Sequence, residues 1–354
     1  MDCDFKQGWY GAHALHVTQI PPAGSAPVRP AVGPSHMSKQ AWRILLVYPP
    51  FLEERIHDDD IRSMPIGLFN VAAVLKDAGY EVALLNLNEG QFPPAQVTGL
   101  IEQFRPDVVG FSILNANRWG GIDLARRVKA LDARIVTVFG GVGASYLWQH
   151  FLTHFDAIDY IVIGEGEHAF RDLVRSLETT AGVDVDRIGG IAFRREGRPA
   201  RTACGPFIPD LDRLPDPTHH FTYHHLSLTR GCPANCRFCG SPGFWGRQVR
   251  FHSPGYFVDQ IERLASRGVS FFHFSDDTFT LRHDLVIAVC QEILARRLTI
   301  QWAAISRVDT VDEVPVQRVE TDAGLAASPV TDSAPQSDLV TSSGGSIVLR
   351  TVDG

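Results

Sequence analysis

Three cysteines lie close together in the chain, directly after an apolar segment that is typical of a strand. Cys232, Cys236 and Cys239 follow the spacing C-x3-C-x2-C. Three thiolates at this spacing can ligate three irons of a 4Fe–4S cluster and leave the fourth iron open. An open iron can bind a substrate and pass it an electron. The spacing therefore predicts an iron–sulfur site with redox chemistry.

A structural zinc site is the alternative for the same three cysteines. It needs a fourth ligand, for which the sequence offers five candidates: Cys204, His219, His220, His224 and His225. Zinc sites usually pair their ligands as two C-x2-C motifs, whereas this set is an asymmetric triple. The pattern therefore favours the iron–sulfur cluster.

Length and composition place the chain among ordinary globular proteins. Its 354 residues suffice for about two domains, and 44% are hydrophobic and 21% charged. A formal net charge of −7 argues against nucleic acid as the main partner. There is no apolar run long enough for a membrane span and no signal-peptide pattern at the N-terminus. With clustered cysteines that suggest a reducing compartment, we expect a cytoplasmic protein.

The first half of the chain alternates apolar runs with segments of helical period. Such alternation predicts a parallel sheet with helices on both faces, a doubly wound, flavodoxin-like α/β domain over residues 42–180. Ligands bind such sheets at the carboxyl ends of the strands. The expected strands are 43–48, 81–87, 107–112, 134–140 and 160–164, and the expected helices are 65–78, 97–104, 122–131 and 168–177.

A second alternating unit follows a proline-rich linker at 181–225. The expected strands are 226–229, 269–275 and 299–304, and the expected helices are 254–267, with Ser253 as N-cap, and 281–296. These repeats predict a partial (β/α) barrel over residues 226–312. Residues 1–41 and 313–354 have no sustained period, and we expect both to be disordered.

Residues 226–311 resemble the first part of a radical S-adenosylmethionine (SAM) enzyme. The three cysteines, the aromatic Phe238 before the last of them and Gly240 after it carry the resemblance. It implies that SAM binds the open iron of a 4Fe–4S cluster. An electron from the cluster then cleaves SAM to methionine and a 5′-deoxyadenosyl radical. Phe238 would pack near the adenine, and Gly240 would belong to the same cofactor site.

The same resemblance assigns polar groups to SAM. Asp276 or Asp277, after the second expected strand, would accept a hydrogen bond from the SAM ammonium. Arg307, after the third strand, would reach the SAM carboxylate or a substrate. The family also implies a low-potential electron donor, such as flavodoxin or ferredoxin, and a small-molecule or peptide substrate. No catalytic residue is assigned.

Residues 42–178 resemble the cobalamin-binding domain that often precedes a radical SAM domain. Ser112, Leu114, Gly140 and Gly141 match the motif that admits the nucleotide tail, because glycine lets backbone approach a flat ligand closely. The alternative is a plain flavodoxin-like sheet without a cofactor. Residues 164–167 (Gly-Glu-Gly-Glu) are expected to form a turn and an interdomain contact.

One departure from the broader cobalamin pattern concerns the cobalt ligand. Many cobalamin proteins have Asp-x-His-x-x-Gly after the second strand, but residues 86–90 are Asn-Leu-Asn-Glu-Gly, without histidine. No histidine of this motif would therefore ligate the lower face of cobalt. Cobalamin-dependent radical SAM enzymes commonly share this loss.

Together the resemblances imply a cobalamin-dependent radical SAM enzyme. It would transfer a methyl group from methylcobalamin to an unactivated carbon, or catalyse a related radical rearrangement or cyclisation. Such barrels usually have six or more strand–helix units, whereas about three are recognised here, so the sequence also suggests a truncation or frame shift near residue 313. The alternatives are a non-catalytic fragment that binds cobalamin and a labile cluster or none, and a zinc-stapled cobalamin carrier.

Overall fold

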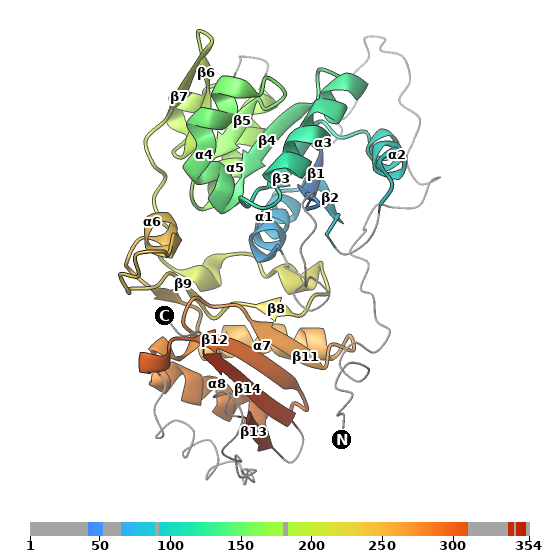
Figure 1. The fold of residues 1–354 in the computed structure, drawn as a ribbon. Coiled ribbons are helices and arrows are strands. Elements are labelled where there is room, and N and C mark those ends of the chain that lie inside the picture. The colour runs from blue at the N-terminus through green and yellow to red at the C-terminus, as the bar shows by residue number, and fades with distance from the viewer. Residues whose placement is uncertain are drawn as a thin grey trace, which may run out of the picture.

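The computed structural model describes residues 42–51, 65–88, 92–179, 183–310, 339–342 and 345–351. They form two α/β units, one above the other in Figure 1, with the cysteine loop between the two sheets. The N-terminal segment 1–41, which we expected to be disordered, lies outside the described residues.

The first unit is built on a seven-stranded sheet with the order β2-β1-β3-β4-β5-β6-β7. Five parallel strands come first in the chain: β1 (Arg43–Tyr48), β2 (Glu81–Asn86), β3 (Val108–Ser112), β4 (Val136–Gly140) and β5 (Tyr160–Val162). Every residue of β1 is buried, because helices cover both faces of the sheet. The apolar run at 43–48 reflects this double burial.

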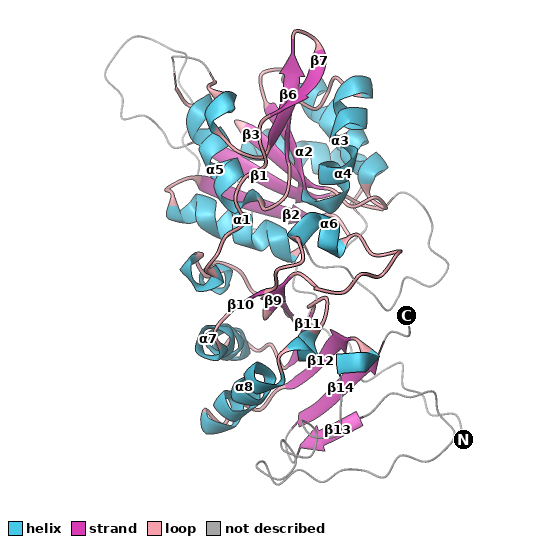
Figure 2. Cartoon of the chain, turned by 90° about the vertical axis from the view of Figure 1, so that its left-hand side faces the viewer, coloured by secondary structure: helices cyan, strands magenta, loops and turns pink. Residues whose placement is uncertain are grey.

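Helices cover the two faces of this sheet unequally (Figure 2). The five helices are α1 (Ile66–Asp77), α2 (Pro94–Phe104), α3 (Arg118–Leu131), α4 (Gly141–His154) and α5 (Gly166–Leu177). Side chains of α1 and α5 belong to one core cluster, and those of α2, α3 and α4 to the other. The predicted doubly wound sheet is confirmed.

Two elements of the first unit were not predicted. Helix α4 begins with the sequence Gly-Val-Gly, and its glycines weaken the helical signal. The segment 181–225 was interpreted as a linker, but it contains the hairpin β6 (Ile191–Arg195) and β7 (Arg198–Arg201), which extends the sheet. Its two-residue turn has positive φ at Glu196 and Gly197, as a type I′ turn requires. Glu is uncommon there, so the turn signal is weak.

The second unit contains a five-stranded sheet with the order β13-β14-β12-β11-β8. Its strands are β8 (His225–Leu226), β11 (Phe271–Phe274), β12 (Gln301–Ser306), β13 (Leu339–Ser342) and β14 (Gly345–Thr351). A separate small pair joins β9 (Thr229–Arg230) to β10 (Arg250–Phe251). The α-helices are α6 (Ser241–Trp245), α7 (Pro254–Ala265) and α8 (His283–Ala295). Short 3₁₀ turns are η1 (Val185–Arg187), η2 (Leu211–Arg213), η3 (Pro217–His219), η4 (Phe279–Leu281) and η5 (Val308–Thr310).

Strands β8, β11, β12 and β14 run parallel, as in a (β/α) barrel. Alternate residues of β11 point to opposite faces of the sheet. Phe274 belongs to the core with the α7 residue Phe257, and the two ring centroids are 5.0 Å apart. Ser253 caps α7 as predicted, since its Oγ accepts from the Tyr256 N–H at 3.3 Å. His273, between Phe272 and Phe274, therefore belongs to the face opposite these helices.

The interpretation of 313–354 as a disordered tail is wrong for residues 339–342 and 345–351. They form the antiparallel pair β13–β14, and β14 adds to the sheet beside β12. Ser-Ile-Val-Leu-Arg-Thr at 346–351 is rich in residues that favour strands, a signal that the polar surroundings obscured. The other residues of this segment lie outside the described part of the chain.

The two units share one hydrophobic core. Phe69 of α1 stacks on Tyr223 at a centroid distance of 4.4 Å, and it also packs against Phe221 at 5.4 Å. All three rings are fully buried. The segment before β8 thus joins the first sheet's helix layer to the second sheet and holds the two units together.

Candidate cofactor sites at the domain junction

The three cysteines lie in the loop that follows β9. Gly231, just before Cys232, has a φ of +104°, and a Cβ there would meet the Gln248 carbonyl oxygen at 3.1 Å. A side chain would therefore strain this turn. Exposure increases along the motif: Cys232 is buried, Cys236 is half-buried and Cys239 is exposed. The loop runs from the protein interior to the surface within eight residues.

Each cysteine sulfur has a polar neighbour. The Sγ of Cys232 lies 3.6 Å from Thr278 Oγ1, and the Sγ of Cys239 accepts from the Ser241 N–H at 3.5 Å. Arg307 donates from Nη1 to the Sγ of Cys236 at 3.0 Å. Donors to thiolate sulfurs stabilise their negative charge and tune the potential of a cluster. The three-thiolate donor set fits a 4Fe–4S cluster with one open iron.

A zinc site would need tighter packing than the cysteine loop shows. Ligand sulfurs on one tetrahedral zinc lie about 3.8 Å apart. Over the ranges that the structure describes, one group of three His, Cys, Asp or Glu residues has its ligand atoms all within 4.8 Å, and it consists of His224, His225 and His273. The cysteines are not part of it. Burial lowers the pKa of His224 to about 4 and that of His225 to about 2, so both imidazoles are neutral at pH 7.

Asp276 anchors the start of the cysteine loop. Its carboxylate is buried and accepts from the Thr229 N–H at 2.6 Å, from Thr229 Oγ1 at 2.7 Å and from the Leu228 N–H at 3.3 Å. Burial raises its pKa to about 6, against these hydrogen bonds, which lower it. Asp277 is exposed and accepts from the Ser241 hydroxyl. That either carboxylate receives the SAM ammonium stays a prediction.

The other residues assigned to SAM surround the same loop. Phe238 is 80% exposed, so its ring is open to a ligand. The Gly240 carbonyl accepts a 2.6 Å hydrogen bond from Tyr146 of α4, which ties the loop to the first unit. Arg307 is bound to Asp309 as well as to Cys236. It therefore lies beside the proposed cluster, and its contact with SAM or substrate stays a prediction.

A cavity of about 280 Å³ lies at the carboxyl ends of β1, β3 and β4. All four residues predicted for cobalamin line it: Ser112, Leu114, Gly140 and Gly141. The rest of the wall is mostly apolar and comes from strands β1, β3, β4 and β5 and from the region of α1 and α5. Phe244 and Trp245 of α6, which follows the last cysteine, also line the cavity. The cysteine loop and the predicted cobalamin pocket are therefore adjacent.

Two glycines of the cavity wall allow neighbouring parts of the chain to pack closely. Gly141 has a φ of +88°, and a Cβ there would meet the Ile113 carbonyl oxygen at 3.0 Å. A Cβ at Gly110 would come within 2.9 Å of Leu46 Cδ2 and 3.1 Å of Phe170 Cζ. A Cβ at Gly140 would meet no atom closer than 3.9 Å, so the end of β4 has open space beside the cavity. Sequence reasoning missed Gly110, although a glycine inside a strand often marks close approach of a ligand or backbone.

Asn117 is a second residue that sequence reasoning missed. It is fully buried, and its side chain accepts from the Leu114 N–H at 2.8 Å and donates to the Ser112 carbonyl at 3.2 Å. Asn117 thus fixes the Ser-x-Leu segment against the cavity. In the segment where other cobalamin proteins have the cobalt-ligating histidine, Asn88 donates from its backbone N–H to the side chain of Asn86 at 3.1 Å.

A buried ion-pair network joins the two units beside the cavity. Glu165 contacts Arg230 at 2.9 Å and Arg250 at 2.8 Å, and Glu167 contacts Arg230 at 2.7 Å. All four side chains are at most 9% exposed. Burial lowers the pKa of Arg230, but the two carboxylates outweigh it and raise the pKa above its usual value. The turn at 164–167 is therefore an interdomain contact, as the sequence predicted.

These features define a class of protein. Residues 62–174 match the B12 binding domain family, and residues 226–320 match the radical SAM superfamily. Residues 62–174 are thus a B12-binding domain and residues 226–320 a radical SAM domain, as predicted. Its predicted cofactors, cobalamin, a 4Fe–4S cluster and SAM, are those of the two domains.

Curated relatives of this class include methyltransferases and cyclases. The chain is 26% identical to an uncharacterized methyltransferase of Pyrococcus horikoshii, over 77% of this chain and 62% of the relative. It is 29% identical to the anaerobic magnesium-protoporphyrin IX monomethyl ester cyclase of Synechocystis, over 76% and 56%. With the cytidylyl-2-hydroxyethylphosphonate methyltransferase of Streptomyces wedmorensis it shares 28%, over 69% and 56%. The chain thus spans 56–62% of the length of these relatives.

Solved structures share the fold. The radical SAM methyltransferase TsrM of Kitasatospora setae, with cobalamin and a 4Fe–4S cluster bound, matches with a TM-score of 0.64 and 20% identity, over 79% of this chain and 58% of that one. The cobalamin-dependent SAM radical enzyme OxsB matches with a TM-score of 0.62 and 19% identity, over 79% and 41%. In the part of the chain that the structure describes, no helix is long and apolar enough to cross a membrane.

Proposed function

We propose that this protein catalyses cobalamin-dependent radical SAM chemistry, with methyl transfer to an unactivated carbon or a related radical rearrangement or cyclisation. The observation that carries the proposal is the shared wall of the cavity. Phe244 and Trp245 follow Cys239 by only a few residues, yet they line the same cavity as Ser112 and Gly141. Two cofactors bound at these places would serve one active site.

The cluster would supply the electron that cleaves SAM, and cobalamin would supply the methyl group. In this proposal Cys232, Cys236 and Cys239 hold the cluster. Arg307 and the Ser241 N–H donate to the cysteine sulfurs and would stabilise the negative charge of the ligated cluster. Asp276, just after β11, holds the segment before the cysteines through Thr229 and Leu228, so the cysteines keep their place relative to the sheet.

The cavity walls suit a cobalamin tail and a radical reaction. Glycines at the strand ends admit a flat group, and Asn117 holds the Ser-x-Leu segment that would contact it. The wall around them is mostly apolar, which limits water near a reactive radical. No histidine of residues 86–90 would reach the cobalt, so its lower face is left without that ligand.

The substrate and partners remain part of the proposal. The named relatives act on a porphyrin ester and on a phosphonate nucleotide, which favours a small-molecule substrate, with a peptide as the alternative. A low-potential flavodoxin or ferredoxin would supply the electron. We propose a cytoplasmic location and no nucleic-acid partner, in line with the net charge of −7.

Anaerobic reconstitution tests the proposal. The full chain would be loaded with iron, sulfide and hydroxocobalamin, reduced, and given SAM, and 5′-deoxyadenosine would be measured by mass spectrometry. We expect release of 5′-deoxyadenosine, and none from a variant with Cys232, Cys236 and Cys239 all changed to alanine. A bound corrinoid without SAM cleavage would contradict the enzyme proposal and support a cobalamin-binding, non-catalytic protein.

A further inference from the structure

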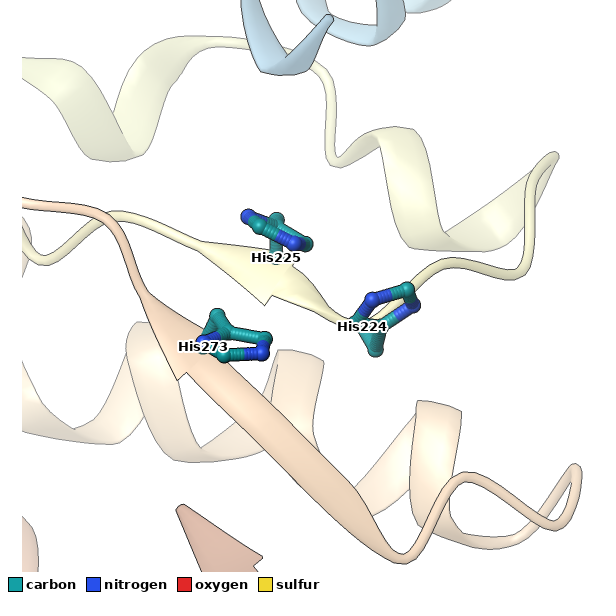
Figure 3. A group of neighbouring side chains, drawn as sticks. All are labelled: His224, His225 and His273. Carbon is teal, nitrogen blue, oxygen red and sulfur yellow. The ribbon is translucent and has the colours of Figure 1, made fainter. Parts of the chain in front are cut away.

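Three histidines gather on the second sheet, away from both cofactor sites described above. His225 lies in β8, His273 lies in the neighbouring β11, and His224 directly precedes β8 (Figure 3). One ligand nitrogen from each lies within 4.8 Å of those of the other two. From the sequence alone, His224 and His225 are candidates only as zinc ligands together with the cysteines. The structure instead groups them with His273.

The sheet itself brings these side chains together. His273 pairs with His225 across the parallel strands β11 and β8, so both side chains leave the sheet on the same face. The His273 N–H donates to the His224 carbonyl at 2.8 Å, which holds the third residue beside them. The ring centroids of His225 lie 4.7 Å from those of His224 and of His273. The strand register and a backbone hydrogen bond therefore bring the main chains of all three residues together.

We propose that His224, His225 and His273 form a binding site for one divalent transition-metal ion of the zinc type. Imidazole nitrogen is a preferred ligand for such ions, and three imidazoles leave one position of a tetrahedral ion open. That position would take water or an oxygen atom of a bound small molecule. Metal binding requires neither the 4Fe–4S cluster nor cobalamin, so the site stands independently of the proposed function.

The present ring positions need only a small adjustment. Ligand nitrogens around one tetrahedral zinc lie about 3.4 Å apart. The histidine nitrogens now lie within 4.8 Å of one another, so each ring would have to move by about 1 Å to reach that spacing. The terminal torsion of histidine has a broad energy minimum, and a ring rotation can supply this shift. His225 and His273 are now stacked at 27° between ring planes, and they would turn their nitrogens towards a common centre.

Ser275 orients one of the three ligands. Its Oγ lies 2.9 Å from Nδ1 of His225. If the serine oxygen accepts from Nδ1–H, the Nε2 lone pair of His225 is directed away from Ser275 and is available to a metal. Metal-bound histidines almost always have such a partner on the second ring nitrogen. Ser275 is therefore a positioning residue for the site, rather than a ligand.

The location of the site suggests where the ion would act. His225 and His273 project from the face of the sheet opposite α7 and α8, which corresponds to the interior of a (β/α) barrel. Just after β11, Ser275 and the anchor carboxylate Asp276 follow His273 along the chain. The open position of a bound ion would face the barrel interior.

Cobalt titration of the full chain with its cluster assembled tests the site. After removal of loose metal, Co²⁺ would be added and its visible d–d absorption recorded, and bound zinc would be counted by elemental analysis in a parallel Zn²⁺ dialysis. We expect one equivalent of either metal beyond the cluster, without the thiolate charge-transfer band that cysteine ligation produces. His224→Gln and His273→Gln should each lose this binding, whereas the matched control His219→Gln, an exposed histidine, should keep it.

Three results of the metal titration would contradict the three-histidine site. Binding that is the same in His273→Gln and His219→Gln, or Co²⁺ spectra with thiolate bands only, would exclude a three-histidine site. So would the absence of any bound equivalent in the unchanged protein.

A second variant guards against a simple folding defect. Ser275→Ala keeps all three imidazoles and should weaken Zn²⁺ binding by about 10- to 100-fold, the usual effect of removing such a partner. Ser270→Ala, an exposed serine just before β11, is its control. Zn²⁺ should also raise the melting temperature of the unchanged protein and of Ser270→Ala more than that of Ser275→Ala. Equal Zn²⁺ affinity in the two serine variants would contradict the proposal.

Discussion

The two cofactor sites of this protein are built in different ways. The cavity of the first unit lies between packed strand ends and helices, and its shape depends on glycines that leave space. Polar groups hold the cysteine loop of the second unit: Asp276 at its start, Arg307 beside it and Tyr146 at its end. The first site should therefore be sensitive to volume, and the second to charge and hydrogen bonding.

The junction network should show the largest effect. Arg230→Met removes the partner of two buried carboxylates, and we expect about 3–5 kcal/mol loss in the free energy of unfolding, because Glu165 and Glu167 would lose their shared cation. Denaturant titration of the full chain measures it. The control Arg213→Met breaks an exposed pair with Asp210 and should cost at most about 1 kcal/mol. Equal losses in both variants would show that the network does not hold the units together.

The loop anchor should give the second unit a distinctive pH dependence. The pKa of Asp276 is raised to about 6 from 3.8, so the folded protein holds this proton more tightly than the unfolded chain. The protonated Asp276 therefore contributes up to about 3 kcal/mol to the free energy of unfolding. This contribution is fully present below about pH 4 and is lost as the pH rises through 6. Asp276→Asn should remove that slope, as denaturant titrations from pH 4 to 7 can measure. An unchanged slope in Asp276→Asn would contradict the burial effect.

Much of this arrangement could be predicted from the sequence. Ser112, Gly140 and Gly141 converge because parallel strands bring their carboxyl ends to one edge, and strand positions are readable from apolar runs. The cysteine spacing is local and needs no tertiary information. Asn117, Trp245 and the partners of Glu165 were not predicted, because their roles come from contacts between segments far apart in the chain. No local pattern encodes such contacts.

The cavity should respond to added volume without loss of the fold. Gly140 has extended backbone, and the nearest atom to a Cβ there is 3.9 Å away, so valine fits the backbone but projects beside the cavity. Gly140→Val should weaken cobalamin binding by about 10- to 100-fold, since overpacking costs about 1–3 kcal/mol. Iron and sulfide content should stay unchanged, and the exposed Gly99→Val should bind normally. Normal cobalamin affinity in Gly140→Val would place cobalamin elsewhere.

The smallest effect is expected at the contact between the two sites. Tyr146→Phe removes one hydrogen bond to the Gly240 carbonyl, which is worth about 0.5–1.5 kcal/mol. Because it ties the end of the cysteine loop to α4, the cluster should be lost to a chelator several-fold faster, with cobalamin affinity unchanged. Tyr160→Phe, on β5 and away from the loop, should lose its cluster at the normal rate. Identical rates of cluster loss in Tyr146→Phe and Tyr160→Phe would show that this hydrogen bond does not hold the cysteine loop.

We infer that the cysteine loop and the glycine-lined cavity serve one active site, and electron paramagnetic resonance gives the sharpest test. Both cofactors would be loaded into the full chain and reduced to paramagnetic states, and the cobalamin signal recorded by electron paramagnetic resonance. Because Phe244 and Trp245 form a shared wall, we expect the nearby cluster to broaden the cobalamin signal. The broadening should disappear in Cys232→Ala, which loses a cluster ligand. A sharp cobalamin signal that is the same in both proteins would contradict a shared site.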